Sequence, residues 1–224
     1  MKQFIFVIAL ATLACATDSP QNAEPSDLQA EPRVFENKIK EKIKALIEQL
    51  GDPIKLEDVK LQTENEQIKL DLAMTGTITG ISKYEIPKLT LSMVGLKFTF
   101  KFVIPKLDVD ITSYALTASL NMLPMHGAGT IVASVQELTL EGKGKLGSSG
   151  DGLVFLENID VGLAIGDLKF AITGWLDDEE RSKMISELVE KVVPDVLKEY
   201  ADETRTILSG LIMKLTDGLK IKFP

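Results

Sequence analysis

The chain has 224 residues, of which 45% are hydrophobic, and it carries a formal net charge of −8 at pH 7. This composition is too apolar for a disordered protein. The acidic balance excludes nucleic acid as a partner and disfavours an anionic membrane surface as the main partner, because both are bound through Lys and Arg. With a single cysteine, Cys15, the chain offers neither a disulfide framework nor a cysteine metal site.

The N-terminal segment has the features of a secretory signal peptide. Lys2 supplies a positive charge, an apolar run covers residues 4–14, and residues 14–16 (Ala-Cys-Ala) form a small–x–small cleavage site. The apolar run is shorter than the roughly 20 residues that cross a bilayer. An alternative, lipidation of the cysteine, needs an aliphatic residue where Thr12 stands. We therefore predict a signal peptide over residues 1–16, secretion to the extracellular space and no stable membrane insertion.

Residues 17–31 are polar and contain two prolines, which predicts a flexible segment. Pro32 then opens a short amphipathic helix, which Gly51 followed by Asp52-Pro53 ends. Its apolar side chains recur at three- and four-residue spacing, with Lys and Glu on the opposite face. They are Phe35, Ile39, Ile43, Leu46, Ile47 and Leu50.

Between residues 54 and 173 the apolar period changes from 3.6 to 2. The clearest run is 96–102, where Phe98, Phe100 and Phe102 alternate with Lys and Thr. The alternation predicts roughly nine strands, each with one apolar face. Strands of this kind with short polar turns are typical of an antiparallel sheet that is wet on one side.

The last segment predicts a long amphipathic helix. Four carboxylates at 177–180 mark its start, where the helix dipole favours negative charge. An apolar stripe then continues to Leu215, and Pro194 within it must kink the helix or split it in two. A one-faced sheet of this size must curl over something apolar. The predicted fold is therefore α+β: a highly curved antiparallel β-sheet wrapped around one long C-terminal α-helix, with a short N-terminal helix.

Two motifs with catalytic associations have structural interpretations. Gly142, Gly144 and Gly147 match G-x-G-x-x-G, but no helix follows to receive a pyrophosphate, so we interpret the stretch as a hairpin loop and predict no cofactor. His126 is the only histidine and lies in a predicted turn without a nucleophile motif nearby. It supports neither a hydrolase nor a metal site, so the chain is predicted not to be an enzyme.

The apolar interior is the feature of the sequence that indicates a function, because it could bind a ligand. Periodicity alone does not decide whether this interior is packed or hollow. We place a candidate ligand site between the aromatic strand, the strand that follows it and the dry face of the long helix. Its residues are Phe98, Phe100, Phe102, Tyr114, Leu116, Leu188, Val192, Val196 and Tyr200. Tyr114 and Tyr200 offer hydroxyls to an ester, acid or epoxide oxygen of a ligand.

Several short motifs, in order, resemble the insect juvenile-hormone-binding and takeout-like family. They are Gly80-Ile81-Ser82, Pro105-Lys106-Leu107, Tyr114, Leu123-Pro124-Met125-His126-Gly127-Ala128-Gly129 and Gly174-Trp175-Leu176, followed by a long helix with a central proline. We predict a single lipid-binding domain over residues 32–224. The resemblance covers about residues 34–215 and implies a tubular lipid-binding fold. It also implies that the first helix, with Phe35, Ile39 and Ile43, acts as a gate. The family usually carries a cysteine pair near the mature N-terminus, which this chain lacks.

Two functions follow as hypotheses. The first is a secreted carrier of a small hydrophobic ligand, and the resemblance implies a juvenile-hormone-like terpenoid, a fatty acid or a related lipid. The second is a secreted protein of the same fold that adsorbs to lipid or other interfaces without holding a ligand. A carrier releases stoichiometric lipid on solvent extraction, whereas an adsorbing protein lowers surface tension. A protein receptor is not identified by the sequence.

Overall fold

The computed structural model describes residues 31–64, 68–92, 94–120, 123–149, 153–218 and 221–222. The predicted signal peptide (1–16) and residues 17–30 of the polar segment lie outside the described residues. The elements in chain order are α2 (Glu31–Leu50), β1 (Ile54–Glu64), β2 (Ile68–Thr79), η1 (Ile81–Lys83), β3 (Glu85–Ser92), β4 (Lys97–Leu120), β5 (Leu123–Ser149), β6 (Leu153–Ala164), β7 (Asp167–Ile172), α3 (Glu179–Glu199), α4 (Ala201–Thr216) and β8 (Ile221–Lys222).

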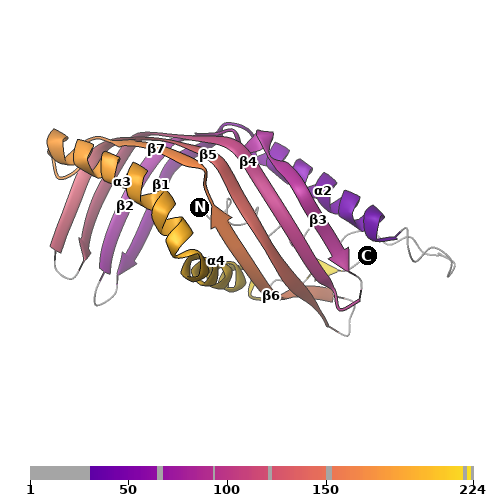
Figure 1. Cartoon of the computed structure of the whole chain (residues 1–224). Helices are drawn as coiled ribbons and strands as arrows, with labels where there is room; N and C mark the ends of the chain where they lie inside the picture. Colours follow the sequence, from indigo (N-terminus) through magenta and orange to yellow (C-terminus); the bar gives the residue numbers. More distant parts are fainter. Residues whose placement is uncertain are drawn as a thin grey trace.

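One antiparallel sheet contains all eight described strands, and two of them, β4 and β5, run its whole length (Figure 1). At one end β4 pairs with β2 and β5 with β7, and β1 lies outside β2. At the other end β4 pairs with β3 and β5 with β6. Register shifts, such as the one between Ile111 and Tyr114 in β4, bend the long strands. The curved antiparallel sheet predicted from the alternation is confirmed.

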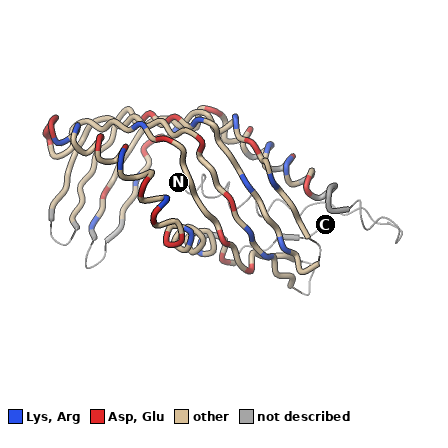
Figure 2. Tube along the Cα trace, in the orientation of Figure 1, with Lys and Arg blue, Asp and Glu red and all other residues tan. Residues whose placement is uncertain are grey.

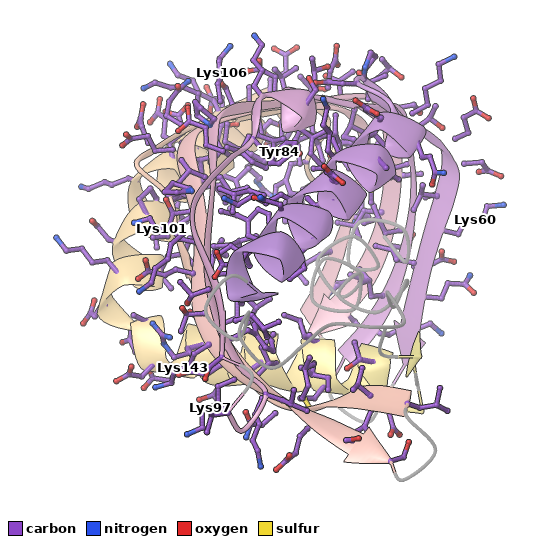
Figure 3. The ribbon with its side chains drawn as sticks, turned by 90° about the vertical axis from the view of Figure 1, so that its right-hand side faces the viewer. Lys60, Tyr84, Lys97, Lys101, Lys106 and Lys143 are labelled. Carbon is purple, nitrogen blue, oxygen red and sulfur yellow. The ribbon has the colours of Figure 1, made fainter. Side chains whose placement is uncertain are left out.

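The helices cover the two ends of this sheet differently. α2 packs against β3 and α4 packs against β6, so both cover the same end, whereas α3 packs against β7 at the other end. Seen along the sheet, the strands bend round α2 and α4 closes the ring below it (Figure 3). We call the end formed by β3, β6, β8 and their partner stretches the closed end, and the end formed by β1, β2 and β7 the open end.

The strand count differs from the roughly nine expected, because stretches expected as separate strands are continuous in β4 and β5. Pro105 lies inside β4, although proline cannot donate a ladder hydrogen bond. β4 tolerates it because Pro105 sits where its neighbour changes: pairing with β3 ends at Val103 and pairing with β2 begins at Asp108. Pro105 therefore lacks a backbone N–H at a position where neither β3 nor β2 is paired with β4.

The sequence predicts a hairpin loop at 142–147 and a turn at His126, but both stretches lie inside β5, so these two predictions are wrong. Gly142, Gly144 and Gly147 belong to β5, where Gly142 pairs with Phe100 and Gly144 with Phe98 of β4. His126 also lies in β5, opposite Thr117. Pro124 and Gly127 near His126, like the Gly and Ser residues of 142–152, favour turns in general, which explains both wrong predictions.

The helical predictions are confirmed at their ends and refined in the middle. The side chain of Asp178 caps α3 by accepting a hydrogen bond from the Arg181 N–H at 3.0 Å. Pro194 lies inside α3, which continues to Glu199. The split falls at Tyr200, whose φ of −106° and ψ of 40° separate α3 from α4, and the two helices then run in different directions (Figure 1).

Two apolar clusters line the inner face of the sheet. The larger one occupies the closed end and combines fifteen buried side chains from α2, the strands and α4, among them Ile39, Phe98, Val161 and Ile212. The smaller one, at the open end, has three buried members, Ile111, Tyr114 and Ile172. None of the described helices is long and apolar enough to cross a membrane.

Candidate functional site

The aromatic side chains of β4 lie in the closed end. Phe98 and Phe100 are buried and Phe102 is half-buried. Their rings form a continuous row: the centroids of Phe98 and Phe100 are 6.2 Å apart and stacked, and those of Phe100 and Phe102 are 5.8 Å apart, edge to face. Aromatic pairs at these separations attract one another beyond the burial of their area.

The G-x-G-x-x-G glycines of β5 make room for these rings. A Cβ atom added at Gly144 would lie 2.4 Å from Cζ of Phe98, and one added at Gly142 would lie 3.1 Å from Cζ of Phe100. At Gly147 the same atom would lie 2.4 Å from Cζ of Phe155 on β6. Each glycine therefore lets an aromatic ring lie flat over the neighbouring strand, so this motif is a packing device.

α2 completes the closed end with the two described residues of the predicted gate. Ile39 and Ile43 are almost fully buried and pack in the same cluster as Phe98 and Phe100. The Glu36 carboxylate accepts a hydrogen bond from the Leu91 N–H at 3.3 Å, which ties α2 to the free edge of β3. The side chain of Phe35, the third residue of the predicted gate, lies outside the described residues.

Asp52, directly after α2, anchors this helix to η1. Its carboxylate accepts hydrogen bonds from the Gly80 N–H at 2.9 Å and the Ser82 N–H at 3.0 Å, and one from the Ser82 hydroxyl. Burial raises the pKa of Asp52, but these hydrogen bonds and the charge of Lys83 outweigh it and leave the pKa below its usual value. The C-terminal end of α2 is thus fixed by an ionised carboxylate.

Tyr114 and Leu116 lie at the open end. Tyr114 is buried and its hydroxyl donates a hydrogen bond to the Thr173 carbonyl oxygen at 2.8 Å. Burial, and secondarily the charge of Asp177, raise the pKa of Tyr114, so it remains a protonated donor. The Tyr114 hydroxyl, which the sequence analysis predicts as a donor to a ligand, therefore already donates its proton within the protein. Leu116 is half-buried in the same cluster.

α3 is held in place by polar side chains that cap the free edge of β7. Glu190 Oε1 accepts from the Phe170 N–H at 2.8 Å, and Ser186 Oγ accepts from the Ile172 N–H at 3.0 Å. Ser182 Oγ accepts from the Trp175 N–H at 2.9 Å. An edge strand needs such partners for its unpaired N–H groups. Sequence reasoning missed this role, although three polar residues four apart within an apolar helix face were a readable signal.

The predicted ligand residues of α3 are exposed. Leu188, Val192 and Val196 are 51%, 39% and 41% exposed, and Tyr200 is 48% exposed. Leu188, Val192 and Val196 follow Ile185 by three, seven and eleven residues, so all four lie on one face of the helix. Ile185 packs against Ile111, Tyr114 and Ile172 on the inner face of the sheet. The exposed apolar stripe therefore lies on the same side of α3 as Ile185, and Ile185 is its member that packs on this cluster.

The structure divides the predicted site residues into three groups. Phe98, Phe100 and Phe102 join the gate residues Ile39 and Ile43 at the closed end. Tyr114 and Leu116 belong to the open-end cluster. The four helix residues belong to neither cluster, and only their neighbour Ile185 reaches one of them.

The structure places His126 beside an acidic side chain. Its Nε2 lies 3.2 Å from Oδ2 of Asp177 in an exposed pair. Across the described parts of the chain, no group of three or more His, Cys, Asp or Glu side chains is arranged to hold a metal ion. The chemistry that this arrangement offers is apolar contact along α3 and the open end of the sheet.

Comparison with known proteins gives one family. The profile of the haemolymph juvenile hormone binding protein (JHBP) family matches residues 5–224. Among solved structures, Takeout 1 of Epiphyas postvittana is similar at 13% sequence identity and a TM-score of 0.46, covering 73% of this chain and 79% of that one. No curated protein matches the chain.

Proposed function

Because the chain belongs to the haemolymph juvenile hormone binding protein family, we propose that it is a secreted, non-enzymatic carrier that binds one small hydrophobic ligand at its open end. The ligand class is a juvenile-hormone-like terpenoid, a fatty acid or a related lipid. The carrier works in extracellular fluid and needs no cofactor, because its chemistry is the transfer of apolar surface out of water.

The exposed stripe of α3 is the observation that carries this proposal. Leu188, Val192 and Val196 are large apolar side chains on the same helix face as Ile185, which already packs on the inner face of the sheet. On the sheet side, the residues that surround the small open-end cluster are only partly buried. They are Leu56, Leu72, Met74, Val109, Leu116, Ile131, Phe170 and Trp175.

A lipid chain placed between these two apolar surfaces covers both. Each Å² of apolar surface removed from water contributes about 25 cal/mol, so an elongated ligand gains affinity along its length. Tyr200 offers a hydroxyl at the far end of the stripe for the polar group of the ligand. Tyr114 contributes its ring, since its proton is donated to Thr173.

In this proposal α2 is the gate of the closed end. Its buried side chains Ile39 and Ile43 close the cluster that contains Phe98 and Phe100. Its movement is limited by the Asp52 anchor and by the hydrogen bond between Glu36 and the Leu91 N–H. A ligand that reaches the phenylalanine row therefore has to displace α2, whereas the stripe on α3 is accessible without that step.

The test compares two faces of α3 in delipidated protein titrated with a fluorescent fatty acid. We expect Leu188→Gln with Val192→Gln to weaken probe binding at least about tenfold, since two buried apolar contacts of roughly 1.5–3 kcal/mol each are removed. The matched control, Lys191→Gln with Lys198→Gln, changes two exposed residues of the same helix and leaves binding unchanged. Wild-type protein that binds no probe and releases no lipid on extraction would contradict the proposal.

The exposed stripe also supports the second hypothesis, adsorption to an interface, because an unpartnered apolar helix face is surface-active. The two functions differ in stoichiometry. Native mass spectrometry of a carrier gives one ligand per chain before extraction and none after it. An adsorbing protein gives the ligand-free mass both times and lowers surface tension.

A further inference from the structure

The outer face of the closed end carries five lysines whose positions follow from the strand register. Lys97 of β4 lies directly opposite Lys145 of β5, and Lys101 of β4 lies directly opposite Lys88 of β3. Lys143 of β5 sits between these two rows, opposite Thr99. On the inner side of the same strands lie the phenylalanines of the core. We call Lys88, Lys97, Lys101, Lys143 and Lys145 the lysine face.

The lysine face places like charges directly opposite each other on neighbouring strands. Like charges in this arrangement destabilise the strand pairing, yet two such lysine pairs occur on this face, at Lys97 and at Lys101 of β4. Three carboxylates balance part of the charge: Glu141 lies 3.5 Å from Lys101, Asp160 lies 3.5 Å from Lys143, and Glu157 lies 2.8 Å from Lys145.

Within the described part of the chain, Lys88 and Lys97 have no ion-pair partner. The face is therefore locally positive on a chain whose net charge is −8. Figure 2 shows the blue lysine positions on these strands, and Figure 3 places Lys97, Lys101 and Lys143 along one wall of the ring. The net charge of −8 for the whole chain conceals this local excess of positive charge.

An exposed apolar side chain stands at the rim of the lysine face. Val94 is 87% exposed in the turn between β3 and β4, three residues before Lys97. The Ser92 hydroxyl donates a hydrogen bond to the Val94 carbonyl oxygen at 3.2 Å, which helps to fix this turn. A basic surface with an apolar tip at its edge is the combination by which peripheral proteins contact an anionic bilayer: lysines meet the headgroups and the tip enters the interface.

We propose that the lysine face docks the protein reversibly on an anionic phospholipid surface, with Val94 at the contact. The purpose of this docking rests on the carrier function proposed above, because a bilayer is the natural source or acceptor of an apolar ligand, whereas the docking itself is argued from the lysine face and Val94. It places the membrane against the outer wall of the closed end, while the ligand stripe of α3 is at the other end. An acidic protein would also be attracted by the lysines, but it offers no apolar phase for the exposed valine.

The experiment measures binding of the delipidated full-length mature chain to vesicles by co-sedimentation. Vesicles of pure phosphatidylcholine are compared with vesicles that contain 30% phosphatidylserine, at low and at about 150 mM salt. We expect binding to the anionic vesicles only, weakening as salt rises. Lys88→Gln, Lys97→Gln and Lys143→Gln together should reduce the partition coefficient at least about tenfold, because each lysine near such a surface contributes to attraction.

The matched control removes three lysines from the outer side of α3: Lys183→Gln, Lys191→Gln and Lys198→Gln. It loses the same charge, and we expect vesicle binding within about twofold of wild type. Val94→Ser should lower the binding that persists at the higher salt concentration. Equal loss in both triple variants would mean that only net charge matters, and it would overturn the lysine face as the docking surface.

Two further results would overturn the proposal. One is equal binding to both kinds of vesicle, and the other is no binding to either, which would leave the lysines to another anionic partner such as an acidic protein. The fluorescent fatty acid titration in solution separates this inference from the proposed function. We expect the lysine-face variant to bind that probe like wild type. If the wild type binds vesicles but no probe, the carrier function fails and the docking surface stands.

Discussion

The two ends of the sheet are built from the same two long strands but are packed in different ways. β4 and β5 pass through both ends with an alternating pattern of inward and outward side chains. At the closed end, aromatic rings lie over glycines, and isoleucines of α2 and α4 fill the remaining space. At the open end, Ile185 of α3 packs on the small cluster, and Leu188, Val192 and Val196 on the same side of the helix stay exposed.

The difference shows that the helices, rather than the strands, decide whether the inner face is filled. The closed end is packed from three sides and accounts for most of the buried apolar residues. The open end keeps apolar surface that the described residues do not cover. In this interpretation the closed end supplies stability and the open end supplies the binding surface. The variants below test that division or the packing of the closed end.

The largest expected effect is a truncation at the closed end. Phe98→Ala removes a buried ring and should lower the free energy of unfolding by about 3–5 kcal/mol. Leu188→Ala, on the exposed stripe of α3, should lower it by less than about 0.5 kcal/mol. Chemical denaturation of the two delipidated variants measures both values. Similar losses in the two variants would mean that the α3 stripe is part of the core.

Overfilling the two ends provides the next comparison. Leu146→Phe adds volume within the buried cluster of the closed end, of which Leu146 is a member, and should cost roughly 1–3 kcal/mol. Leu116→Phe adds the same volume at the open end and should cost less than that while weakening binding of a fluorescent fatty acid. Thermal melts with and without the probe check both. Strong destabilisation by Leu116→Phe, together with no probe binding by the wild type, would show that the open end is a packed core.

A glycine pair tests whether the G-x-G-x-x-G motif of β5 is a packing device. Gly144→Ala places a methyl 2.4 Å from Cζ of Phe98 and 2.9 Å from the Asn158 carbonyl oxygen, so it should destabilise the protein by roughly 1–3 kcal/mol. Gly210→Ala in α4 meets nothing within 4 Å and should stabilise it by up to about 1 kcal/mol. Urea denaturation gives both signs. Stabilisation by both substitutions would refute the packing role.

The smallest effect concerns the anchor of α2 and its dependence on pH. Because the pKa of Asp52 in the folded protein lies below its ordinary value of 3.8, its stabilising contribution is complete above that value and is lost as pH falls through the folded pKa. Below about pH 4, amide hydrogen exchange in α2 should therefore accelerate more than exchange in β4 and β5. Asp52→Asn should show fast exchange in α2 already at neutral pH. Unchanged exchange in that variant would remove the anchor role.

Much of the fold followed from the sequence because apolar periodicity is a local property. The shift from a period of 3.6 to a period of 2 near residue 54 and back near residue 177 gave the helices and the one-faced sheet. Strand continuity did not follow, since Pro105 and the glycines at 142–147 usually mark loops. Each is tolerated for a tertiary reason: Pro105 sits between two partner strands, and the glycines receive aromatic rings.

For the candidate site, the sequence predicts which residues lie on the apolar face of each strand or helix, and no more than that. Periodicity correctly indicates that Phe98 and Leu188 both lie on apolar faces, but it does not say which faces meet. The structure places them in different regions, because α3 is positioned by Ser182, Ser186 and Glu190 on β7 and not by its own apolar stripe. The four-residue spacing of these polar side chains marks one face of the helix, but it does not identify β7 as the partner of that face.

A spin-labelled fatty acid locates the ligand directly in methyl-labelled protein. If the ligand binds at the open end, the nitroxide of the fatty acid should broaden the methyl NMR signals of Leu188, Val192, Val196 and Leu116. The methyl signals of Ile39 and Val161 at the closed end should remain sharp. Broadening confined to Ile39 and Val161 would place the ligand at the phenylalanine row instead. No broadening at any methyl would contradict ligand carriage itself.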